Sequence, residues 1–400
     1  MTTTLSRGAI AACLAIAAGA ASAATPAWLQ PAYDAGQTFY NPNETTLKPG
    51  NVKQLVRVSS QQPGFNWVGQ TTHAGGALFL CSDRDGLGSL DEATGAERWT
   101  SSALGGTCTA AILAGANLYA TAWHDNVGSF TNTLTALAQA DAGVLWQVFG
   151  PVDPKDKPSW LTFNLPTLSQ NVLYVSSGRS LVASYRADNG RLRWRIQTGF
   201  LNNQTAVAGA LAYTTTWGEG GPVNQVFANN TSDGALAWSR PTDASISEYP
   251  ATVSGGRVFV ASDSGHVRAF DAAAGTPLWD VAFPGYPSSP LVATPQAVIY
   301  TSAHSTLVAA DPATGATLWT TKLKSGDGVD SNLVQAGNVL YAMAGDFSSN
   351  MRLVAFDART GKQLLRSTDV TGGSWANVSV VGGKVYVAVE GSLIEYGLPQ

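Results

Sequence analysis

A nine-residue phrase recurs along this chain and constrains its fold more than any other feature. An Asp is followed four residues later by Gly and eight residues later by Trp, most clearly in residues 91–99, 271–279 and 311–319. From one phrase end to the next, the spacing is 40 to 48 residues. A repeat of that period is typical of one four-stranded propeller blade. Weaker copies end at Trp146, Trp194, Trp238 and Leu365, the last without its Trp.

Each interval between phrases has the pattern of four short strands. In residues 251–283, strand-like runs are separated by a Gly-Gly pair, a Ser-Gly pair and the phrase itself. Paired glycines suit two-residue hairpin turns, because such turns need a positive φ. The composition agrees, since charged residues make up only 12% while there are 42 glycines and 12 tryptophans. We therefore predict an all-β fold.

The two ends of the chain complement each other. Beyond Leu365, residues 377–396 supply three strands and no fourth, whereas residues 51–59 form an orphan strand before the first full repeat. Joining them would close a ring and remove the unpaired edges. We predict an eight-bladed β-propeller of four-stranded antiparallel blades, in which the N-terminal strand completes the C-terminal blade.

The repeated phrase, which we call the tag, has a structural interpretation. Its Asp can accept hydrogen bonds from its own turn. Its Trp is a large plate suited to packing between adjacent blades with its N–H bonded. The tag tryptophans are Trp99, Trp146, Trp194, Trp238, Trp279 and Trp319.

The N-terminus has the pattern of an export signal. Arg7 precedes an apolar run over residues 9–21, and Ala-Ser-Ala at 21–23 provides a small-residue cleavage site. We predict a signal peptide over 1–23, a lead-in segment over 24–50 and a single propeller domain over 51–400. The alternative is a lipoprotein, because Ile10-Ala-Ala precedes Cys13, although the apolar run before Cys13 is short. The mature protein is expected in the periplasm or the medium.

Cys81 and Cys108 remain after signal removal. In an oxidising compartment such a pair is either one disulfide or two buried thiols, and the sequence leaves both open. The formal net charge of −4 argues against nucleic acid and against an anionic membrane surface as partners. The four histidines show no metal-binding spacing.

The loops that lead into the innermost strand of each blade, here called the inlet loops, are the candidate site. They open together on one face of a propeller, and they differ between blades more than the scaffold does. Three tryptophans and three carboxylates among them have the chemistry to hold a flat anionic ligand with a cation such as calcium. The alternative is that they are solvated loop residues and aromatic covers. Aligned through the repeat, the inlet loops contain Asn66, Trp67, Thr107, Trp160, Asn203, Glu248, Tyr249, Ser288, Asp327, Asp330, Ser374 and Trp375.

The tag resembles that of the pyrroloquinoline-quinone-like (PQQ-like) propellers, as does the lead-in through residues 37–55. For enzymes of that class, the resemblance implies PQQ with calcium, a plate of two adjacent disulfide-bonded cysteines, a Trp beneath the cofactor, and Glu, Asn and Asp near the metal. Here Glu248, Asn203 and Asp330 supply the residue types, but the adjacent cysteines are missing. The cofactor-binding candidates are Trp67, Trp160, Asn203, Glu248 and Trp375, and the metal candidates are Glu248, Asp327 and Asp330.

The resemblance allows two functions. We expect a monomeric binding or scaffolding propeller that holds an envelope protein or a small ligand at the channel mouth, because the chain is similar in size and repeat to outer-membrane assembly propeller lipoproteins. The alternative is a small PQQ- and calcium-dependent quinoprotein dehydrogenase that oxidises alcohols or sugars.

Overall fold

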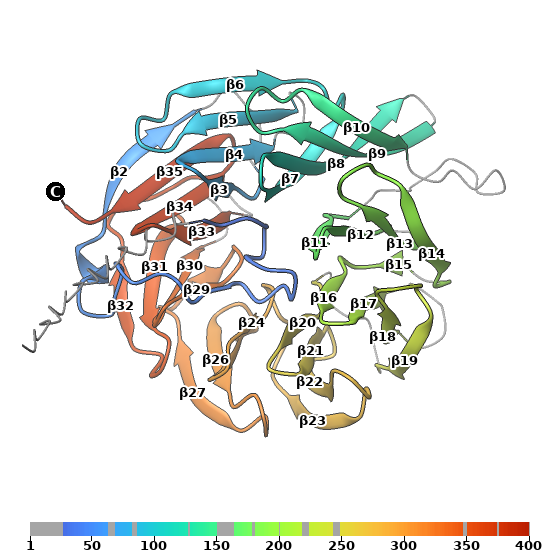
Figure 1. Ribbon diagram of the computed structural model, residues 1–400. Coiled ribbons are helices and arrows are strands. Elements are labelled where there is room, and N and C mark those ends of the chain that lie inside the picture. The colour runs from blue at the N-terminus through green and yellow to red at the C-terminus, as the bar shows by residue number, and fades with distance from the viewer. Residues whose placement is uncertain are drawn as a thin grey trace, which may run out of the picture.

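The computed structural model describes residues 27–62, 69–81, 86–126, 129–149, 164–177, 181–199, 201–217, 224–242, 249–346, 350–373 and 376–399. In these residues 35 strands form eight sheets around a common axis, and residues Val52–Gln54 form a short 3-10 helix, η1. Figure 1 shows the sheets as the blades of a closed ring. The predicted eight-bladed propeller is confirmed.

The first four blades follow one another along the chain, each running from its innermost to its outermost strand. Blade 1 comprises β3 (Thr72–Ala74), β4 (Ala77–Cys81), β5 (Leu87–Asp91) and β6 (Glu97–Ser101). Blade 2 comprises β7 (Thr107–Ala114), β8 (Asn117–Asn126), β9 (Ser129–Ala138) and β10 (Val144–Phe149). Blade 3 comprises β11 (Thr167–Ser169), β12 (Val172–Ser176), β13 (Leu181–Arg186) and β14 (Leu192–Gln197). Blade 4 comprises β15 (Leu201–Asn202), β16 (Ala206–Ala208), β17 (Leu211–Trp217), β18 (Gln225–Asn230) and β19 (Leu236–Pro241).

The next three blades repeat this arrangement, and blade 7, like blade 4, has its inner strand in two pieces. Blade 5 comprises β20 (Thr252–Ser254), β21 (Arg257–Ser262), β22 (His266–Asp271) and β23 (Pro277–Ala282). Blade 6 comprises β24 (Val292–Ala293), β25 (Val298–Ser302), β26 (Thr306–Ala310) and β27 (Thr317–Lys322). Blade 7 comprises β28 (Gly328–Val329), β29 (Val334–Ala336), β30 (Val339–Gly345), β31 (Arg352–Asp357) and β32 (Gln363–Arg366).

Blade 8 is composite, as predicted. Its inner strands β33 (Asn377–Val381), β34 (Lys384–Val389) and β35 (Ser392–Gly397) come from the C-terminus, and its outermost strand β2 (Val56–Gln61) comes from the N-terminus. The antiparallel register sets Val56 opposite Gly397 and Gln61 opposite Leu393. The strand begins later than the predicted residue 51. The Asn51 side chain accepts from the Lys48 amide and donates to the Thr46 carbonyl, so this segment is held as a turn.

The tag tryptophans join neighbouring blades. The indole N–H of Trp238 in blade 4 donates to the Ala272 carbonyl of blade 5 at 2.9 Å. Its ring lies over Gly275, where a Cβ would come within 2.5 Å of the indole, and Gly275 has a φ of +66°. Only glycine satisfies both conditions at low cost. The same indole–carbonyl bond recurs as Trp99–Gln139, Trp146–Ala187, Trp194–Thr231, Trp279–Pro312 and Trp319–Ala358.

The lead-in segment covers one end of the central channel. It lies inside the ring of inner strands, in dark blue in Figure 1, and β1 (Tyr40–Asn41) pairs in parallel with β29 of blade 7. Each contact falls near the carboxyl end of an inner strand, so this segment covers the end at which those strands finish. Its hydrogen bonds reach all eight blades, in order around the ring at His73, Leu113, Leu168, Val207, Val253, Ala293, Gln335 and Val380.

Within the residues described, no helix has the length and apolar character needed to cross a membrane.

Candidate functional site

The described parts of the inlet loops lie at the channel end opposite the lead-in, because each precedes an inner strand whose far end the lead-in contacts. Several of the predicted site residues fall outside the described parts of the chain, and their placement stays a prediction. These are Asn66, Trp67, Trp160, Glu248, Ser374 and Trp375.

Asn203, by contrast, is built into its own blade. Its side chain is only 5% exposed, and its amide donates to Thr215 Oγ1 at 2.8 Å. The backbone N–H of Asn203 also donates to the Thr215 carbonyl. This position therefore ties the start of an inner strand to the second strand of the blade. Similar bonds tie Asn164 to Ser176, Ser288 to Thr301, and Ser331 to Met343.

Of the predicted metal candidates, Glu248 lies outside the described residues, and Asp327 and Asp330 bond to different partners. Asp327 accepts from both Nε and Nη2 of Arg366, at 3.1 and 2.7 Å, and Arg366 belongs to the outermost strand of blade 7. Asp330 lies nearer the axis, where its backbone bonds to Met343 and to Ala376. Among the described positions there is no group of three or more His, Cys, Asp or Glu side chains placed to hold a metal ion.

Cys81 and Cys108 form a disulfide, with their Cα atoms 5.1 Å apart. Of the two states that the sequence left open, the structure has the bonded one. Cys81 ends β4 in blade 1 and Cys108 lies near the start of β7 in blade 2, so the bond joins two blades on the inlet side. Both residues are fully buried in a hydrophobic cluster between these blades. The disulfide therefore serves as an inter-blade link inside the core.

A different cluster, which sequence reasoning missed, lies where blade 8 meets blade 1. In blade 8, Ser59 of the outermost strand pairs with Glu395 just after a bulge. In blade 5, the tag residue Trp279 of the outermost strand pairs with Ala269 at the same place. Ser59 therefore occupies the position that the tag Trp has in other blades. Gln61 lies over the tag glycine Gly95 in place of an indole. The junction between blades 8 and 1 therefore lacks the tag Trp that packs between the other blades. The junction between blades 7 and 8 lacks it too, because the tag of blade 7 ends in Leu365.

His73 is the centre of this cluster and is fully buried. Its Nδ1 is 2.9 Å from Glu92 Oε1, and its Nε2 is 3.0 Å from the hydroxyls of both Thr71 and Ser379. The Tyr386 ring packs against the imidazole at a centroid distance of 4.4 Å, and its hydroxyl donates to Glu92 at 3.1 Å. Residues from the first and last blades are thus joined through one imidazole and one carboxylate.

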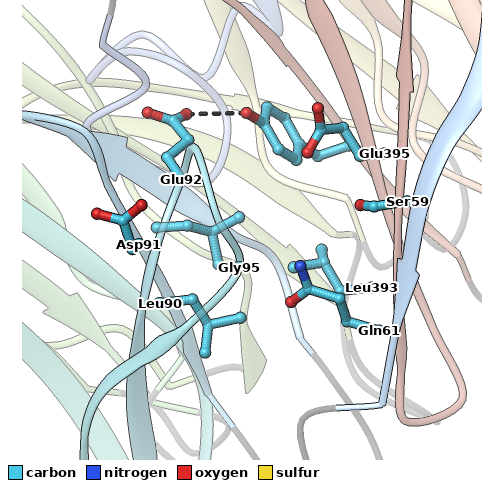
Figure 2. A pocket seen from close by; sticks show the side chains of 10 residues that line it. Ser59, Gln61, Leu90, Asp91, Glu92, Gly95, Leu393 and Glu395 are labelled. Carbon is cyan, nitrogen blue, oxygen red and sulfur yellow. Dashed lines mark hydrogen bonds between the residues drawn. The ribbon is translucent and has the colours of Figure 1, made fainter.

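Beside this cluster is a narrow slot between the blades. Leu90, Asp91, Glu92 and Gly95 of blade 1 face Ser59, Gln61, Leu393 and Glu395 of blade 8 across it, as Figure 2 shows. Its cavity of about 10 Å³ has room for about one water molecule. Lys384 bonds to Glu395 at 2.8 Å and lies 3.5 Å from the Glu92 carbonyl. That carbonyl is equivalent to the ones that accept an indole N–H at the other junctions.

The electrostatics favour an ionised Glu92. Burial alone would raise the pKa of Glu92, but the hydrogen bonds from His73 and Tyr386 and the charge of Lys384 outweigh it and hold the pKa below its usual value. Burial, together with the nearby Glu92 and Glu395 carboxylates, raises the pKa of Tyr386, which therefore stays a neutral donor.

The cluster has the hydroxyl–imidazole–carboxylate order found in acyl-transfer enzymes. However, His73 and Ser379 are 0% and 3% exposed, and the adjoining slot holds no more than about one water. In the described part of the chain the Ser379 hydroxyl is therefore closed off from solvent, and its bond to His73 joins the last blade to the first. A signal was present in the sequence: Glu92 follows the tag Asp, where the other clear tags have Ala or Pro.

A family model with the description "Outer membrane protein assembly factor BamB" matches residues 50–210, 131–242 and 198–396. No curated protein matches the chain significantly. A quinohemoprotein alcohol dehydrogenase from Comamonas testosteroni is similar in structure, with a TM-score of 0.72 and 15% identity over 95% of this chain and 82% of that one.

Two further solved structures share the architecture. BamB from Moraxella catarrhalis has a TM-score of 0.64 and 18% identity, over 86% of this chain and 97% of that one. The computationally designed Ika8 protein has a TM-score of 0.69 and 12% identity, over 87% of this chain and all of that one. At these identities the structural likeness establishes the fold alone. The family model, in contrast, spans most of the sequence, and the chain therefore belongs to the PQQ-like β-propeller family described as outer membrane protein assembly factor BamB.

Proposed function

We propose that this protein is an exported binding propeller that holds an envelope protein or a small ligand at the inlet end of its channel. The observation that carries the proposal is the lead-in, which hydrogen-bonds to all eight blades at the other end. A partner that uses the channel must therefore engage the inlet loops, where the sequence varies most between blades.

The family supports a binding role over a catalytic one. Its description names an assembly factor, and the aligned region of BamB from Moraxella catarrhalis includes 97% of that chain. The predicted signal peptide over residues 1–23 and the disulfide agree with an oxidising compartment such as the periplasm.

Among the described residues, the cysteines do not fit the disulfide plate that the resemblance implies for PQQ. The cysteines are linked within the core between two blades, the Asn203 amide is bonded to Thr215, and Asp327 is engaged by Arg366. The disulfide joins two blades, whereas the bonds of Asn203 and Asp327 lie within blades 4 and 7. We therefore assign no redox step to this chain and keep the dehydrogenase as the outcome that the first experiment below would reveal.

The first experiment mixes the purified mature protein with PQQ and calcium and follows cofactor absorbance and dye reduction with a panel of alcohols and aldoses. The proposal predicts no binding at high micromolar cofactor. Tight stoichiometric binding with dye reduction would overturn it in favour of a dehydrogenase.

The second experiment looks for the partner directly in an exporting host. A photo-reactive amino acid is placed at Tyr286, which is 52% exposed in the inlet loop before blade 6, and in a matched variant at Thr45, which is exposed in the lead-in segment. We expect a discrete cross-linked species from Tyr286 and none from Thr45. Cross-linking from Thr45 alone would place the binding face at the wrong end of the ring.

A further inference from the structure

A second hollow, remote from the channel, lies between blades 3 and 4. It has a volume of about 300 Å³, within the range of small-molecule sites. Ile196 and Gln197 line it from the outer strand of blade 3, and Gln225, Phe227, Asn229 and Leu236 line it from blade 4. No charged side chain belongs to this lining among the described residues, and two hydroxyls complete it.

Asn229 lines this hollow from the third strand of blade 4. Asn229 is the last inward residue of β18 and pairs with Leu236 across a bulge. The residues with the same register are bulky aromatics in blades 3, 5 and 7, namely Tyr185, Phe270 and Phe356, but Leu90 in blade 1, Leu137 in blade 2 and Ala310 in blade 6. The Asn229 amide is shorter than the aromatic rings at this position in blades 3, 5 and 7.

Only one of the two polar atoms of the Asn229 side chain has a hydrogen-bond partner. It is only 4% exposed, and its Nδ2 donates to the Gly234 carbonyl at 2.9 Å. Gly234 itself lies against the Trp194 ring, since a Cβ at this position would be 2.8 Å from the indole. Asn229 Oδ1 is buried without a hydrogen-bond partner. A buried acceptor without a donor is unfavourable, so this atom favours a ligand that brings one.

The lining selects the ligand's chemistry. Side-chain amides and hydroxyls exchange hydrogen bonds with neutral hydroxyl groups. Ile196, Phe227 and Leu236 offer apolar surface to the face of a ring. A charged ligand would lose its hydration with no ion to compensate. We propose that this hollow is a binding site for a neutral sugar ring, one of whose hydroxyls donates to Asn229 Oδ1. The site is independent of the function proposed for the inlet end.

Saturation-transfer NMR and calorimetry on the mature protein test this with D-glucose, D-galactose and N-acetyl-D-glucosamine, each titrated through the millimolar range. D-glucuronate is the charged counterpart. We expect saturable binding of at least one neutral sugar and at least tenfold weaker binding of glucuronate. If no neutral sugar binds saturably, or if glucuronate binds as well as the neutral sugars, the proposal is wrong.

Variants assign any binding to this hollow. Asn229→Phe introduces the aromatic residue that blades 5 and 7 have at this position and should weaken sugar binding at least tenfold. Asp233→Asn, on the same tag turn but outside the lining, should leave it unchanged. If Asn229→Phe does not fold, Ser239→Leu fills the hollow from the neighbouring strand. Undiminished binding in a folded filling variant would place the sugar elsewhere. Cross-linking from Tyr286 should be the same in all of these variants, which separates this site from the inlet end.

Discussion

Truncating Trp238 tests the idea that the tag tryptophans link the blades. Trp238 is 6% exposed and lies among the Tyr213 ring of its own blade, the Phe270 ring of the next and the Gly275 turn. Removing a buried aromatic side chain leaves a cavity and typically costs about 3–5 kcal/mol. Because Gly275 and Phe270 belong to a neighbouring sheet, their backbone cannot collapse onto the space. We therefore expect Trp238→Ala to lower the free energy of unfolding by an amount in that range.

The matched variant Trp238→Phe separates packing from hydrogen bonding. It keeps a ring and removes the N–H that donates to the Ala272 carbonyl. That carbonyl also accepts from the Tyr213 hydroxyl at 3.1 Å, so it stays paired. A hydrogen bond contributes a net of about 0.5–1.5 kcal/mol to the free energy of unfolding. For Trp238→Phe we expect a loss at the lower end of this range from the hydrogen bond, together with a modest loss from packing. Urea unfolding followed by circular dichroism gives both values. A Trp238→Ala variant within about 1 kcal/mol of the parent, well below the range for a buried aromatic, would refute the role given to the tag Trp.

Three further predictions concern the closing junction, the disulfide and the lead-in. Glu92 has a lowered pKa in the folded state, so the stability it contributes is present above its unfolded pKa of about 4.3 and is lost as pH falls through the folded value. Glu92→Gln should therefore lower the melting temperature at pH 7, and the difference in melting temperature between parent and variant should become smaller below pH about 4. A difference that stays constant across this pH range would argue against an ionised Glu92. Replacing Cys81 and Cys108 with Ser opens a loop of 27 residues, and the chain-entropy model gives a loss of about 3–4 kcal/mol in urea unfolding; no loss in the double variant would mean that the link adds nothing to the blade packing. Gly36→Val places a Cβ 2.5 Å from the Val253 carbonyl, which should loosen the lead-in from blade 5. Limited proteolysis should therefore cut the lead-in faster in this variant than in the parent or in the control variant Thr45→Val. Equal rates of cleavage would contradict the docking of the lead-in on blade 5.

The fold was accessible from the sequence because its determinants are local and repeated. A tag Gly such as Gly275 is required by a positive φ and by an indole above it, so each blade carries the same signature. The composite blade was also predictable, because a blade with three strands and a strand without a blade complement each other. The bounds of β2 were wrong, 56–61 instead of 51–59, and its start is late because Asn51 holds a turn that strand composition does not reveal.

The closing cluster was less accessible because its contacts are remote in sequence. His73 and Ser379 are 306 residues apart, and neither belongs to the tag. The docking of the lead-in is similarly invisible, since its carbonyls bond to backbone amides that every residue except proline provides. The inlet loops lack a repeat altogether, so residues such as Asp327 were grouped by chemistry, whereas the structure pairs Asp327 with Arg366 on an outer strand.

Amide hydrogen exchange at the covered end of the channel tests the central claim most directly. The N–H groups of Val207, Val253, Ala293 and Gln335 donate to the lead-in carbonyls of Ala35, Gly36, Thr38 and Phe39. If the lead-in covers this end of the ring, these four amides exchange as slowly as those that pair inner strands within blades, and they become fast when residues 27–43 are deleted. Rapid exchange of all four in the full mature chain would show that the lead-in does not close the channel.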